Sequence, residues 1–80
     1  MKIPVIKDLV ESQSLEALAA AEEAIINEQT LAIEVKGEDE GEQLTHIMAA
    51  IWILNHMQDQ GADFKTALRE YTKKVRVSIS

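Results

Sequence analysis

The stretch GEDEGEQLTHIMAAIWILNHMQDQG, residues 37–61, decides the architecture of the chain. Asp39 and Glu42 have the spacing of a capping box, in which the cap side chain accepts an amide of the first turn. Gly61 is the residue type that commonly ends a helix. Most positions between these residues are apolar, so the sequence predicts a long helix over about residues 40–60. A helix that is apolar nearly all round must be central or buried in an interface.

Two shorter helices are expected before this long one. Pro4 suits a first helical position, and apolar residues follow it at helical spacing, which predicts a helix over about residues 4–11. Ser12 and Ser14 are both good caps for a second helix, over about residues 14–28. One side of that helix is rich in large apolar residues and the opposite side is rich in alanine. The alanine side would allow another helix to pack closely.

The C-terminal stretch has two competing patterns. Val75, Val77 and Ile79 alternate as in a strand. A longer helical stripe runs through the same stretch and includes Phe64, Ala67, Leu68, Tyr71, Val75 and Ile79. Because the longer pattern covers more residues, we expect a helix from residue 64, capped by Asp63 and frayed near its end.

The segment TLAIEVKG, residues 30–37, breaks the helical pattern. Leu31, Ile33 and Val35 alternate with other residues, which is the period of a half-buried strand. A lone strand has unpaired backbone edges and needs a partner. Pairing of residues 31–36 with the same segment of a second molecule is one interpretation, and a packed extended connector is the other.

Length and composition limit the chain to one small domain. Eighty residues bury a modest core, and proteins of this size add disulfides, metals, oligomerisation or very regular helix packing. Cysteine is absent, which excludes disulfides and thiolate sites. We therefore expect a single mainly α domain over residues 1–80, a small bundle of three to four helices with one short extended segment near residues 31–36.

The long apolar helix has more apolar surface than two modest partner helices can cover, which predicts a homodimer. We expect its interface to include an aromatic and several aliphatic side chains. These are Leu31, Ile33, Val35, Ile51 and Trp52.

The charge of the chain is unevenly distributed. The formal net charge of −6 argues against general nucleic-acid binding, which depends on neutralising phosphates with Lys and Arg. Residues 64–80 are basic and residues 11–42 are strongly acidic, so the basic tail could dock on its own acidic middle or on that of a neighbour. No segment has the pattern of a signal peptide or of a membrane span, which makes the cytoplasm the default location.

Glu42 and His46 lie one helical turn apart and allow two interpretations. In one, they are a surface pair that mildly stabilises the helix. In the other, they ligate a divalent ion such as zinc, manganese or iron, because imidazole and carboxylate suit those ions. Glu22 falls inside an apolar stripe, where a carboxylate is costly unless it is paired. It either reaches a cation or water from the edge of the stripe, or meets His46 or His56 within the bundle as a third ligand.

The stretches at residues 33–54 (IEVKGEDEGEQLTHIMAAIWIL) and 63–76 (DFKTALREYTKKVR) resemble a family of short bacterial proteins without assigned function. The resemblance extends from the N-terminal MKIP over nearly the whole chain and implies no substrate, cofactor or catalytic residue. It does imply a gene setting near thiol peroxidase and thioredoxin-like proteins. A cysteine-free member would be a partner or accessory protein there, not the thiol catalyst.

The sequence contains no nucleophile motif and no glycine-rich phosphate loop, and so offers no catalytic residue. The leading hypothesis is a non-enzymatic, dimeric protein-binding module without a cofactor. The alternative is a metal-binding helical protein that uses Glu42, His46 and Glu22.

Overall fold

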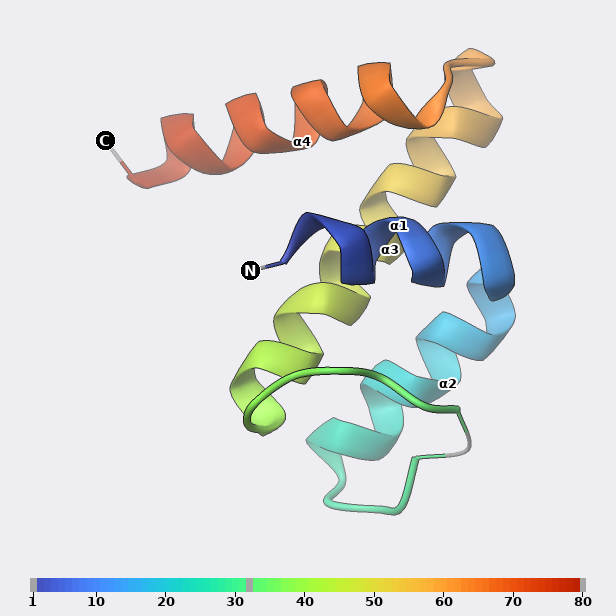
Figure 1. The fold of residues 1–80 in the computed structure, drawn as a ribbon, viewed down its shortest axis with the longest axis vertical. Coiled ribbons are helices and arrows are strands. Elements are labelled where there is room, and N and C mark those ends of the chain that lie inside the picture. The colour runs from blue at the N-terminus through green and yellow to red at the C-terminus, as the bar shows by residue number, and fades with distance from the viewer. Residues whose placement is uncertain (1, 32, 80) are drawn as a thin grey trace.

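The computed structural model describes residues 2–31 and 33–79, the last four of them by their backbone alone. Over these residues the chain forms four helices and no strand (Figure 1), which confirms the mainly α bundle. The helices are α1 (Ile3–Ser12), α2 (Leu15–Ile26), α3 (Glu40–Gln60) and α4 (Phe64–Ile79).

The helix ends follow the capping residues. Ser14, Asp39 and Asp63 each accept a hydrogen bond from the backbone amide three residues further on, at 3.1, 2.8 and 2.8 Å. Such bonds satisfy amides that have no partner within the helix. Gly61 ends α3 with φ of 62°, a left-handed conformation that glycine adopts without strain. The predicted bounds of α3 are confirmed, and α2 ends slightly before the predicted residue.

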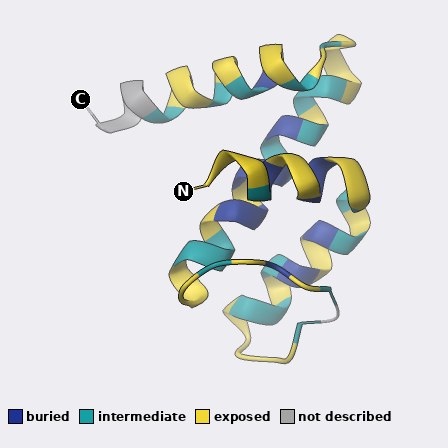
Figure 2. Ribbon diagram, viewed as in Figure 1, coloured by how far each residue is buried: buried dark blue, intermediate teal, exposed yellow. Residues whose placement is uncertain are grey.

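The longest helix, α3, is the centre of the fold, because α1, α2 and α4 each pack against it. The core lies between these helices (Figure 2) and consists almost entirely of aliphatic side chains. The buried apolar residues are Ile6, Leu9, Val10, Leu18, Ala21, Val35, Ile47, Ala49, Ala50, Ile53 and Ala67. The expected central position of α3 is therefore confirmed.

Only one side of α3 is buried, although apolar residues occur all round it. The buried residues of α3 are His46, Ile47, Ala49, Ala50 and Ile53. At about 100° per residue, Leu44, Met48 and Ile51 lie on the opposite side. Met48 is 50% exposed, whereas Leu44 and Ile51 are half-buried. The chain thus leaves an apolar strip of α3, formed by Leu44, Met48 and Ile51, which we call the outer strip.

The apolar stripe predicted for α2, which consists of Leu15, Leu18, Ala19, Ile25 and Ile26, is partly wrong. Leu18 and Ala21 are buried in the core, where α2 packs against α3. Ile26, however, is 64% exposed, and Ala19 is also exposed. Ile26 is the last residue of α2. At about 100° per residue, Ile26 lies on the same side of α2 as Ala19 and away from the buried Ala21, which explains how a large aliphatic residue remains in solvent.

The connector between α2 and α3 contains no strand among its described residues. Leu31 and Ile33 pack half-buried against the core, Val35 is buried, and the polar residues Glu34 and Lys36 are exposed. The alternation in the sequence therefore reflects one side of an irregular connector packing on helices. Pairing of this segment across a dimer stays a prediction.

The C-terminal stretch is helical to Ile79, which confirms the helical interpretation over the strand. Ala67 is buried against α3, and Phe64, Leu68 and Tyr71 pack half-buried around the core. In Figure 1, α4 crosses one end of α3 and extends past it. Its later turns therefore have less of the bundle beneath them than its first turns.

Candidate functional site

His46 is the one buried polar or charged residue among those the structure describes, and its side chain is 0% exposed. Its Nε2 atom lies 2.9 Å from the backbone nitrogen of Lys2. Its Nδ1 atom lies 2.8 Å from the backbone oxygen of Lys36. The ring therefore joins α3 to the start of α1 and to the end of the connector. We call this arrangement the His46 clamp.

The partners of His46 determine its protonation state. The Lys36 carbonyl can only accept, so Nδ1 carries the proton and donates it. The Lys2 amide can only donate, so Nε2 is unprotonated and accepts. The clamp thus holds a neutral imidazole with both nitrogens satisfied, which is how a buried polar group avoids a large free-energy cost. An i+4 surface pair with Glu42 does not form, because both ring nitrogens bind backbone groups.

Two further contacts hold the connector against the first turns of α3. The side-chain amide of Gln43 donates through Nε2 to the backbone oxygen of Val35 at 3.0 Å. A Cβ atom added to Gly37 would lie 2.8 Å from Cγ and 2.9 Å from the backbone nitrogen of Gln43. Glycine at position 37 therefore permits the close approach that brings the Lys36 carbonyl to His46.

Glu42, His46 and Glu22 do not form a shared ligand set in this structure. His46 uses both nitrogens in its clamp, and Glu22 is half-buried on α2. Among residues 2–31 and 33–79, no group of three or more His, Asp or Glu side chains is placed to hold a metal ion. The Oε1 atom of Glu42 is buried and accepts no hydrogen bond from any described residue. In a capping box the side chain of Glu42 would also bond back to the backbone amide of Asp39, and this bond is not among those of the described residues.

A small aromatic cluster joins α3 to α4. The rings of Trp52 and His56 stack with centroids 4.9 Å apart and an interplanar angle of 10°. The Tyr71 ring lies 5.6 Å from the Trp52 ring at 51°. Burial against this cluster raises the pKa of the Tyr71 hydroxyl. His56 thus packs against Trp52, which gives it a structural role within the chain.

The predicted interface residues lie in two places. Leu31, Ile33 and Val35 face the chain's own core from the connector, and Val35 is only 4% exposed. Ile51 and Trp52 are half-buried on α3. Ile51 lies in the outer strip beside Met48. The sequence assigned Met48 to the core or to a dimer interface without choosing between them, because a helix that is apolar all round does not show which side its neighbours cover. The structure places Met48 outside the core, at 50% exposure.

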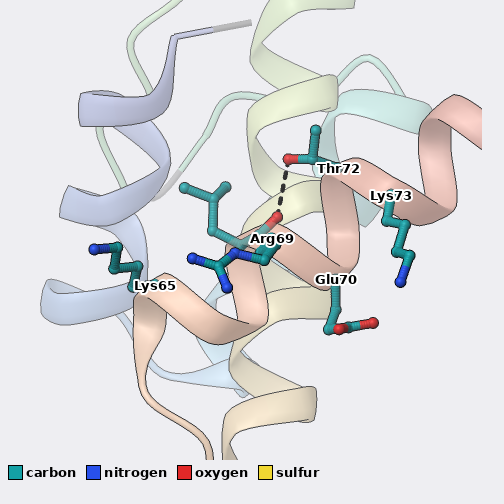
Figure 3. A pocket seen from close by; sticks show the side chains of 6 residues that line it. Lys65, Arg69, Glu70, Thr72 and Lys73 are labelled. Carbon is teal, nitrogen blue, oxygen red and sulfur yellow. Dashed lines mark hydrogen bonds between the residues drawn. The ribbon is translucent and has the colours of Figure 1, made fainter.

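A hollow of about 480 Å³ follows one flank of α4 (Figure 3). Its lining combines cations with one aliphatic side chain and consists of Lys65, Leu68, Arg69, Glu70, Thr72 and Lys73. Thr72 donates its hydroxyl to the Leu68 carbonyl at 2.9 Å, so it takes part in no contact across the hollow. Figure 3 shows the side chains of Lys65 and Arg69 extending toward the same side of the helix. We call this surface the basic flank of α4.

Asp63, the residue before α4, is the other titratable group whose pKa is shifted. Asp63 has a pKa below its ordinary value of 3.8, chiefly because its carboxylate accepts the backbone amide and the hydroxyl of Thr66. The positive charge of Lys65 contributes in the same direction. Because the folded pKa is depressed, the carboxylate stabilises the fold above its ordinary pKa and loses this contribution as the pH falls through the lowered value.

The fold and these contacts define a small all-α protein built on one central helix. No described helix is long and apolar enough to cross a membrane. The chain belongs to a family of unknown function, DUF6952, whose model matches residues 1–80. No curated protein and no solved structure matches it.

Proposed function

We propose that the chain is a non-enzymatic protein-binding module that works as a homodimer. The outer strip of α3 is the observation that carries this proposal. Leu44, Met48 and Ile51 lie on the side of the central helix opposite to its fully buried residues. Met48 is half exposed, Leu44 is half-buried, and Ile51 is half-buried at the edge of the core. An apolar strip on a central helix is typical of an interface.

The total surface of the chain supports the same proposal. The chain exposes 5395 Å², whereas a compact monomer of this mass exposes about 4,800 Å². The excess of about 600 Å² approaches the roughly 800 Å² that each partner buries in a standard interface. Association would therefore reduce the exposed surface of each chain to about that of a compact globular protein of the same mass.

Replacing Met48 by glutamate tests the dimer. The new carboxylate would be buried without a partner, and we expect association to weaken about a hundredfold, which corresponds to about 3 kcal/mol. Light scattering or sedimentation equilibrium over a wide range of protein concentrations measures the effect. Gln29→Glu is the matched control, because Gln29 is also exposed and acquires the same charge. A wild-type chain that stays monomeric at every concentration would contradict the proposal.

Cation binding is a second candidate, and the buried Oε1 atom of Glu42 favours it. A buried carboxylate oxygen without a hydrogen bond is a costly arrangement that a bound ion would relieve. For His46 to join as a ligand, however, it would have to release either Lys2 or Lys36. A site built on Glu42 alone would bind weakly.

Elemental analysis and calorimetric titration with zinc and manganese test this second candidate. A metal-binding protein would take up about one ion per chain, and Glu42→Gln, which keeps the shape of the side chain, would abolish uptake. Glu40→Gln is the control, because Glu40 is an exposed carboxylate in the same turn. Absence of uptake in the wild-type chain would leave Glu42 as part of a helix start only.

The partner protein is a further part of the proposal. The resemblance implies a thiol peroxidase or thioredoxin-like system, in which a cysteine-free chain would bind a thiol protein without taking part in its chemistry.

A further inference from the structure

The basic flank of α4 carries a row of three cations that turns gradually around the helix. Lys65, Arg69 and Lys73 follow one another at intervals of four residues, and all three are exposed. Residues four apart on a helix are neighbours, so the row runs for about 12 Å along the helix. Leu68 lies half-buried at the apolar edge of the row. The flank thus offers an apolar edge next to a line of positive charge.

One cation of this flank, Lys65, acts electrostatically on Asp63 of its own chain. Neither Arg69 nor Lys73 forms an ion pair with any residue that the structure describes. Residues 64–80 carry five bases and one acid, a net charge of +4. The remaining 63 residues carry three bases and thirteen acids, a net charge of −10. The charges that would match α4 therefore lie on the body of the chain.

The solvent side of α2 has matching charge and shape. Glu16 and Glu23 are exposed, lie on the same side of α2 and are separated by about 10 Å along its axis. Ala19 and Ala20 are exposed beside them, so the surface between the two carboxylates is smooth. Small side chains allow helix axes to approach to about 8 Å, the short end of the usual range.

The basic flank cannot reach this surface within one chain. Of the other helices, α2 and α4 each pack against α3, and Figure 1 shows α4 across one end of α3 with α2 beside the other part. A second molecule has no such restriction. Because a two-fold axis repeats every contact, two chains would form the α4-to-α2 contact twice.

We propose that the basic flank of α4 docks on the solvent side of α2 in a second copy of this chain. Arg69 and Lys73 pair there with Glu16 and Glu23, and Leu68 packs against the exposed alanines. This inference rests on the proposed homodimer and names its charged contact. The acidic body of the chain would repel a nucleic acid or an anionic membrane, whereas it attracts the α4 of another copy.

A charge swap between two variants tests the contact. One variant carries Arg69→Glu and Lys73→Glu, and the other carries Glu16→Lys and Glu23→Lys. In each variant alone, like charges face each other across the contact, so we expect its self-association to weaken at least tenfold. In an equimolar mixture, a heterodimer of the two variants pairs opposite charges at both of its contacts, so heterodimers are expected to form. Native mass spectrometry, after circular dichroism has shown both variants to be folded, distinguishes the species.

The control variant carries Glu11→Lys and Glu34→Lys, which changes net charge equally at exposed positions away from the solvent side of α2. It is expected to associate as the wild type does. If the reversal of charge at Arg69 and Lys73 prevents folding, a variant with Arg69→Ala and Lys73→Ala provides the milder test. The self-association of this variant should lose most of its salt dependence.

Heterodimers no more abundant than either variant's homodimers would overturn the docking contact. If Met48→Glu still dissociates the dimer in that case, the proposed function stands and only this contact is wrong. Binding of wild-type chain to phosphatidylserine vesicles, without salt-sensitive self-association, would assign the basic flank to a membrane surface and also overturn the contact.

Discussion

His46→Ala is expected to lower the free energy of unfolding by about 3 kcal/mol. The substitution removes a fully buried side chain and leaves a cavity between α1, α3 and the connector. It also leaves the Lys2 amide and the Lys36 carbonyl without their hydrogen-bond partner, which adds to the loss. For a domain of this size the midpoint of thermal unfolding should fall by about 15 °C.

Thermal and urea unfolding followed by circular dichroism measure this effect. His46→Gln keeps one donor and one acceptor and should recover part of the stability. The matched control is His56→Ala, which removes only a half-buried ring stacked on Trp52 and should cost about 1 kcal/mol. Equal losses at the two positions would contradict the clamp. A fully stable His46→Ala chain that had lost metal uptake would favour the metal-binding candidate instead.

Ile53→Ala is expected to lower the free energy of unfolding by about 3 kcal/mol, because Ile53 is 0% exposed at the centre of the fold. Met48→Ala is a change of similar size on the same helix. When the chain is dilute and monomeric, it should change the free energy of unfolding by no more than about 0.5 kcal/mol, because Met48 is on the surface.

Urea unfolding at low protein concentration compares the two variants directly, with the slope against urea expected to remain that of the wild type. At high concentration the cost of Met48→Ala should grow, since the outer strip is then covered by a second chain. A cost at Met48 equal to that at Ile53 in the dilute sample would show that the outer strip is buried within the monomer.

The sequence predicted the helices well because their ends depend on local chemistry. Asp39, Gly61 and Asp63 act on residues within one turn, so their effects can be inferred without knowing the rest of the fold. The C-terminal helix was predicted for a related reason: a stripe over several turns outweighs a short alternation of three residues.

The candidate site was less predictable because its contacts join distant parts of the chain. His46 bonds to residues 44 and 10 positions away, and both partners are backbone atoms, which every residue type carries. No pattern of side chains could identify them. Segment 31–36 is a similar case, since a half-buried strand and a connector packed on helices both alternate in the same way.

The bond between His46 and Lys2 also determines which parts of the chain unfold together. It ties the second residue to the longest helix, so the chain between them, α2 included, is closed into a unit held at both ends. α4 lies outside this closed unit and packs chiefly on α3. Release of α1 breaks the clamp, whereas release of α4 leaves it intact. Opening of α4 is therefore the least costly departure from the native state, and the part of the chain that carries the basic flank can move while the rest stays folded.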